Sequence, residues 1–96
     1  MANKPEREQP QQLQINTADE ISRGRYSNTL LVSHSPEDFI LDWILNSPNG
    51  SHLVSRVIMS PGNLKRVCEA LRTNIAQYEE KYGTINIVDP EEHKLH

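Results

Sequence analysis

Cysteine, aromatic residues and long apolar runs are all scarce in this sequence of 96 residues. A single cysteine, Cys68, excludes an internal disulfide, so the chain shows no sign of an oxidising compartment. No apolar run approaches the roughly 18 residues of a membrane-spanning helix, and no signal-peptide core opens the chain. We therefore expect a reduced, cytoplasmic protein without membrane contact.

The residue types that carry enzyme chemistry are present, but their spacing fits no catalytic or metal centre. The four histidines and Cys68 form no metal-ligand pattern. Gly50 and Gly62 stand alone, which excludes a phosphate-binding loop. Asp38 and Asp42 lie four residues apart, but Asp38 falls in a predicted turn, so we expect no acid–base pair. The sequence thus predicts a protein that is not an enzyme and holds no cofactor or metal.

The charge balance is mildly acidic, with 10 basic and 13 acidic residues and a net charge of −3. This balance argues against a dedicated binder of duplex DNA, although a local basic patch is compatible with it. Residues 1–11 and 89–96 are polar, and the first segment has the composition of a disordered tail. The remaining residues, 12–88, are expected to form one small α+β domain.

The clearest pattern in the chain predicts one long amphipathic helix over residues 61–82. Ser60 suits the N-cap, and Pro61 suits the first helical position, where its missing N–H costs nothing. Gly83 suits the left-handed residue that closes a helix. Apolar side chains recur at three- and four-residue steps along one side, here termed the helix stripe: Leu64, Val67, Leu71, Ile75, Tyr78 and Tyr82.

Two basic residues, Lys65 and Arg66, occupy the first turns of this helix, where the macrodipole disfavours positive charge. A breach of a local rule can mark a functional site, so these residues are candidates for contact with an anionic partner. The alternative is a solvated helix face built from good helix formers. The candidate anion or nucleic-acid patch comprises Arg23, Arg25, Tyr26, Lys65 and Arg66.

Three segments rich in β-branched and aromatic residues precede the helix, over residues 28–34, 39–45 and 53–59. Residues 35–38 suit a turn with proline at its second position, which makes the first two segments a hairpin. The alternative is a short helix from Pro36 to Leu45. The expected pairs across the hairpin are Val32–Leu41 and Leu30–Trp43. Marginal edge strands are also expected at residues 13–15 and 85–88.

The hairpin between the second and third strands follows from the turn sequence Pro48-Asn49-Gly50. A three-residue loop puts proline at the first turn position and glycine at the left-handed bulge position. The resulting register brings the only two charges inside these strands, Asp42 and Arg56, opposite each other. Its other expected pairs are Ser47–Ser51, Ile40–Ile58 and Ile44–Val54.

Alternation sorts the strand residues onto two faces of the sheet. The apolar face, which we expect the helix to cover, carries Leu30, Val32, Phe39, Leu41, Trp43, Leu45, Leu53, Val57 and Met59. The opposite face, termed the charged-pair face, carries Leu31, Ile40, Asp42, Ile44, Val54, Arg56 and Ile58. A solvated sheet face should be mostly polar, whereas this one is largely aliphatic. We therefore predict a homodimer that buries it; the alternative is a monomer whose termini fold over it.

Four runs of the sequence resemble, in the same order, the small prokaryotic family known as domain of unknown function 3467. The runs are Arg25-Tyr26-Ser27-Asn28, residues 35–43, residues 56–61 and residues 74–83, and the resemblance spans residues 13–88. At residues 63–66 the family usually shows His or Gln, Ala and Lys, and here only Lys65 agrees. The family is uncharacterised, so the resemblance implies a small bacterial protein and transfers no site residue.

A second resemblance is architectural. Several strands followed by one long helix, with an Arg-x-x-x-x-Pro step from Arg56 to Pro61, are similar to the repeat of purine-rich-element-binding proteins. Those repeats pair to bind single-stranded nucleic acid, which needs cations along a backbone track and aromatic rings for stacking. The residues that would serve are Arg23, Arg25, Arg56, Lys65, Arg66 and Tyr26. Our main hypothesis is a non-catalytic assembly module that acts as a homodimer with an unknown partner, and nucleic-acid binding is the alternative.

Overall fold

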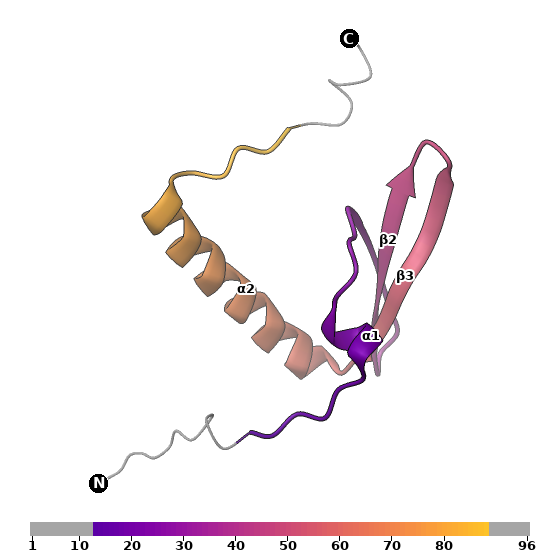
Figure 1. The fold of residues 1–96 in the computed structure, drawn as a ribbon. Helices are drawn as coiled ribbons and strands as arrows, with labels where there is room; N and C mark the ends of the chain where they lie inside the picture. Colours follow the sequence, from indigo (N-terminus) through magenta and orange to yellow (C-terminus); the bar gives the residue numbers. More distant parts are fainter. Residues whose placement is uncertain (1–12, 89–96) are drawn as a thin grey trace, which may run out of the picture.

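The chain forms an open three-stranded antiparallel sheet followed by one long helix (Figure 1). The computed structural model describes residues 13–88. Its elements, in chain order, are α1 (Asp19–Ser22), β1 (Thr29–His34), β2 (Phe39–Ser47), β3 (Gly50–Met59) and α2 (Pro61–Tyr82). The predicted α+β meander is therefore confirmed, with β2 in the middle of the sheet. The predicted tails, residues 1–11 and 89–96, lie outside the described residues.

The first hairpin forms as the turn sequence predicts. The Ser35 hydroxyl accepts the backbone N–H groups of Glu37 and Asp38, each at 3.3 Å, and the Ser35 N–H donates to the Asp38 carbonyl at 2.9 Å. The alternative helix from Pro36 to Leu45 is wrong, because the residues from Phe39 onward are paired in β2. The pairs Val32–Leu41 and Leu30–Trp43 are confirmed.

The second hairpin differs from its prediction at the turn end. Ser47 pairs with Gly50, so the loop contains only Pro48 and Asn49, and Gly50 adopts φ +119°. The predicted pairs Ser47–Ser51 and Ile44–Val54 are wrong, because Ile44 pairs with Leu53. A shorter loop leaves one extra residue on β3, and the ladder absorbs it as a bulge at Val54. Beyond the bulge the predicted pairs Asp42–Arg56 and Ile40–Ile58 are confirmed.

The long helix α2 begins and ends where the sequence predicts. The Ser60 hydroxyl accepts the Asn63 N–H at 3.4 Å, and Pro61 follows at the first helical position. At the other end, the Gly83 N–H donates to the Glu79 carbonyl, and Gly83 has φ +100°. The Glu79 carboxylate accepts the Ile85 N–H at 2.9 Å. Residues 83–88, which follow α2, form neither helix nor strand.

The marginal edge strands are absent from the described residues. Residues 13–18 and 83–88 carry no strand, so the sheet keeps three strands. Ile87 is 92% exposed and Leu13 is 71% exposed. The alternation of apolar residues does not produce strands here, because neither segment is paired with an edge of the sheet that would supply backbone hydrogen bonds. A single helical turn, α1, forms at Asp19–Ser22.

The helix does not cover the sheet, contrary to our expectation. In Figure 1, α2 projects from the end of β3 as a separate arm, and its far end lies well away from the strands. Among the described residues, only Leu41, in the centre of β2, is a buried hydrophobic side chain, with 6% exposure. The helix leaves the sheet because a single residue, Ser60, connects β3 to α2 and the proline ring of Pro61 restricts the backbone at this junction. Neither described helix combines the length and apolar character needed to cross a bilayer.

Candidate interaction surfaces

The centre of the charged-pair face holds a bidentate ion pair. Arg56 on β3 donates from Nε to Asp42 Oδ1 at 2.6 Å and from Nη2 to Asp42 Oδ2 at 3.0 Å. These hydrogen bonds, together with the guanidinium charge, lower the pKa of Asp42 below its ordinary value, and the carboxylate in turn raises the pKa of Arg56. The Asp42 side chain is only 18% exposed and that of Arg56 is 55% exposed. The face thus carries one neutralised pair in a fixed geometry.

The aliphatic side chains around this pair are unevenly covered. Leu31 and Ile58 are more than half exposed, whereas Ile40 and Ile44 on the central strand are partly buried. Because of the bulge, the prediction that Val54 lies on the charged-pair face is wrong. Val54 lines a cavity with Trp43 on the apolar face, and Leu53 takes its place beside Ile44.

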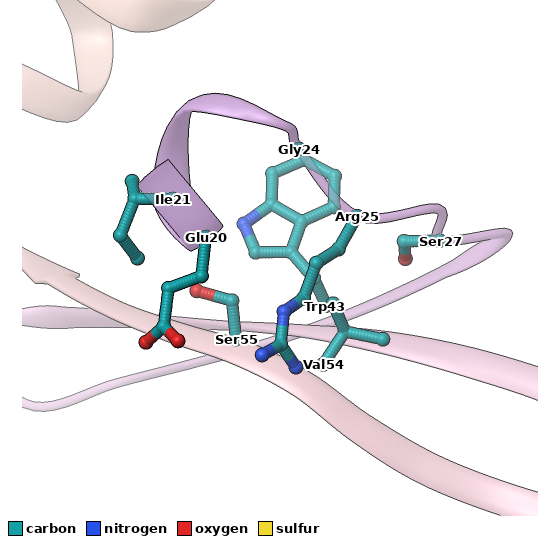
Figure 2. A pocket seen from close by; sticks show the side chains of 8 residues that line it. All are labelled: Glu20, Ile21, Gly24, Arg25, Ser27, Trp43, Val54 and Ser55. Atoms are coloured by element: carbon teal, nitrogen blue, oxygen red, sulfur yellow. The ribbon is translucent and has the colours of Figure 1, made fainter. Parts of the chain in front are cut away.

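A cavity of about 600 Å³ lies on the apolar face, beneath the α1 segment. Figure 2 shows the Trp43 indole rising from the sheet towards the loop at Gly24, with the Arg25 side chain beside it. The remaining lining residues are Glu20, Ile21, Ser27, Val54 and Ser55. The site therefore combines one aromatic surface and one cation with a carboxylate at its rim.

The residues of the predicted anion patch are not gathered into one site. Arg25 lines the Trp43 cavity, and Tyr26 is 76% exposed. Lys65 instead lines a separate groove at the start of α2, and Arg66 donates from Nη1 to the Asn63 side-chain oxygen at 3.0 Å. Arg23 closes α1, where its backbone N–H donates to the Asp19 carbonyl. The structure thus divides the patch between α1 with its following loop and α2.

Two polar residues that the sequence analysis did not single out fasten β1 to the end of β2. The Asn28 side chain donates to the Asn46 carbonyl at 2.9 Å and accepts the Asn46 N–H at 2.8 Å. The Ser27 hydroxyl donates to the Ile44 carbonyl at 2.9 Å. Both residues lie in a run on which the family resemblance was noted, and these bonds give that run a structural role. Propensity rules treat such residues as turn formers, so they did not predict a pairing across 17 or 18 residues.

The helix stripe is a third uncovered surface. Leu71, Ile75 and Tyr78 are about half exposed, and Tyr82 is 65% exposed. The Tyr78 and Tyr82 rings lie 4.9 Å apart, and the Lys81 ammonium lies 5.2 Å from the Tyr82 ring centroid. The far end of α2 therefore presents an aromatic pair with nothing from its own sheet over it.

The fold and these surfaces define a small α+β protein whose apolar surface lies largely open. The chain belongs to the family DUF3467, described as a protein of unknown function, whose family model matches residues 1–87. No curated protein and no solved structure matches the chain. The likeness to purine-rich-element-binding repeats thus remains a resemblance of element order.

Proposed function

We propose that this protein is a non-catalytic assembly module that acts as a homodimer. The observation that supports this proposal is the single buried hydrophobic side chain, Leu41, in a described region that exposes Leu31, Ile58 and most of the helix stripe. A domain of this size needs to bury most of its apolar side chains to offset the entropy of folding. A second copy is the simplest source of the missing contacts.

Two surfaces compete to hold the pair together. The charged-pair face, with Leu31, Ile40, Ile44, Ile58 and now Leu53 around the Asp42–Arg56 pair, is the contact proposed from the sequence. The helix stripe is equally bare in the structure. The proposal of a homodimer requires one of them, and variants on each separate the two.

The test of the proposal is the mass of the full chain in solution. We expect light scattering and sedimentation at micromolar concentration to give twice the chain mass of 11.0 kDa. On dilution the dimer should dissociate in a concentration-dependent way, with loss of helical circular dichroism, because association and folding share the same contacts. A folded protein with the mass of one chain at every concentration would overturn the proposal.

One observation favours a second candidate, single-stranded nucleic-acid binding. Arg25 lies beside the Trp43 indole in an open cavity, which pairs a cation with a stacking surface (Figure 2). Trp43 is the only tryptophan, so its fluorescence reports directly on this cavity. Binding predicts quenching by an oligonucleotide, weaker as salt rises, that Arg25→Glu abolishes and Lys65→Glu with Arg66→Glu reduces less. Unchanged fluorescence at low salt would exclude it.

A further inference from the structure

The junction between β3 and α2 directs the helix away from its own sheet. Met59 ends β3 and Pro61 begins α2, so Ser60 alone connects them. Ser60 is extended, with φ −69° and ψ 156°, and its hydroxyl is engaged by the Asn63 N–H. Connections that return a helix onto its sheet usually span several residues. This one-residue link, fixed by a cap and a proline, holds the two arms of the molecule apart (Figure 1).

Only the start of the helix stripe lies near its own sheet. The groove at the junction, about 510 Å³, has Phe39 on the sheet and, on the helix, Pro61, Gly62, Leu64, Lys65, Cys68, Glu69 and Arg72. At about 100° per residue, the centre of the helix stripe lies roughly a third of a turn from Lys65, Glu69 and Arg72. The more exposed part of the stripe, from Leu71 to Tyr82, lines no part of this groove and is half exposed or more.

The sheet has a vacant face that suits this stripe. Val32, Leu41 and Val57 form a row across all three strands of the apolar face; Val32 is 52% and Val57 39% exposed, whereas Leu41 between them is buried. The α1 segment covers only the Trp43 end of the face (Figure 2). The charged-pair face is less suitable, because the Asp42–Arg56 pair occupies its centre.

The helix and the longest strand of the sheet have about the same length. The 22 residues of α2 extend about 33 Å, and the ten residues of β3 extend about the same distance. Seven exposed side chains would be covered in each copy: Leu30, Val32, Val57, Leu71, Ile75, Tyr78 and Tyr82.

The area available also reaches what a stable dimer needs. At half exposure, aliphatic and aromatic side chains of this size offer on the order of 100 Å² each. A reciprocal contact uses both surfaces of both copies, so each copy contributes on the order of 700 Å², close to the roughly 800 Å² per partner of a standard interface.

We infer that two copies exchange their α2 helices, each helix stripe lying on the apolar face of the other copy's sheet. This inference rests on the proposed homodimer and assigns its contact. The exchange is isologous, since each copy gives one helix and receives one. It leaves both charged-pair faces on the outside of the dimer, available for a further partner.

A designed disulfide tests which chain each helix lies on. In a full-length Cys68→Ser background, Val32→Cys and Ile75→Cys place one thiol on the apolar face and one on the helix stripe. We expect mild oxidation to link two chains covalently on a non-reducing gel. The matched control pairs Val32→Cys with Thr73→Cys, on the opposite side of α2, and should link at least tenfold less. A disulfide within one chain would show that α2 folds back on its own sheet, which overturns the inference.

Association measurements on single substitutions give an independent readout. Ile75→Asp should weaken dimerisation at least a hundredfold, because every dimer carries the buried charge twice. Thr73→Asp and Ile58→Asp should leave the dimer intact. If Ile58→Asp dissociates the dimer while Ile75→Asp does not, the exchange is wrong and the homodimer stands. If the unsubstituted protein has the mass of one chain, both proposals fall.

Discussion

Local sequence signals specify both the sheet and the helix, but the two differ in the contacts that they make within the chain. In the sheet, backbone ladders join β2 to both neighbours, the Asn28 side chain binds Asn46, and the Asp42–Arg56 pair bridges two strands. The helix α2 has an N-cap, a glycine stop and an apolar stripe, yet from Leu71 onward this stripe is half exposed or more. Local signals therefore specify a helix without specifying where it packs.

The difference bears on stability. A helix of 22 residues draws most of its stability in a protein from the packing of its apolar side. The sheet already has one buried centre, Leu41. Substitution of Leu41, which its own sheet already buries, should therefore act on the chain itself, whereas substitutions on the helix stripe should act through association.

The largest effect expected within the sheet comes from Leu41→Ala. Leu41 lies opposite Val32 and Val57, and removing its buried methyl groups should lower the free energy of unfolding by about 2–4 kcal/mol. Urea denaturation followed by circular dichroism measures the change. Ile87→Ala, at a side chain that is 92% exposed, is the control and should change little. Equal losses of unfolding free energy in the two variants would show that Leu41 does not form a hydrophobic core within the sheet.

The next effect is expected from Asn28→Ala, which removes the bonds that fasten β1 to β2. Loss of two hydrogen bonds to Asn46 should cost about 1–2 kcal/mol and expose β1 to amide exchange. Asn49→Ala is a matched control, because within the described residues the Asn49 side chain makes no hydrogen bond. Hydrogen exchange should rise in β1 and stay unchanged in β3. A uniform rise along the sheet would mean that Asn28 supports more than its own strand.

The sequence predicted the elements well because each carries its own local signal. Ser60 and Gly83 set the ends of α2, and the Ser35 turn set the first hairpin. Alternation alone could not reveal the bulge at Val54, since a bulge arises from how a two-residue loop and Gly50 close the second hairpin. One displaced residue was enough to exchange Leu53 and Val54 between the two faces.

The candidate surfaces were less predictable than the fold. The Asp42–Arg56 pair followed from register, because two opposite charges in neighbouring strands have few other partners. The patch of Arg25 and Lys65 did not form one site, because sequence proximity to a helix start says nothing about distance across a junction. The angle between α2 and the sheet depends on the one-residue link at Ser60. The amphipathic pattern of the helix predicts that its apolar side packs against another apolar surface, but it does not identify that surface.

A smaller and local effect is expected from Ser60→Ala. Loss of the hydroxyl that accepts the Asn63 N–H should cost about 1 kcal/mol and fray the first turn of α2. Amide exchange at Asn63 and Leu64 should accelerate, while exchange in β2 stays constant. Ser60→Asp keeps an acceptor at the cap and should restore protection. If Ser60→Ala also accelerates amide exchange in β2, the stability of the helix is coupled to that of the sheet.

The smallest effect concerns the ion pair and has a defined pH range. Hydrogen bonds from Arg56 lower the pKa of Asp42, so the unfolded chain binds a proton on Asp42 more readily than the folded chain. The stabilisation is therefore complete above the unfolded pKa of about 4 and is lost as the pH falls below it, through the folded pKa. Both side chains keep contact with solvent, so the contribution should be modest and weaker in high salt.

Asp42→Asn isolates this contribution from the other carboxylates. We expect the difference in urea midpoint between the unsubstituted protein and Asp42→Asn to be constant from pH 5 to 7 and to narrow below about pH 4. A difference that stays the same at pH 3 would show that Asp42 matters through its shape on the charged-pair face. In that case packing around Asp42, and not its charge, would hold the two strands together at this position.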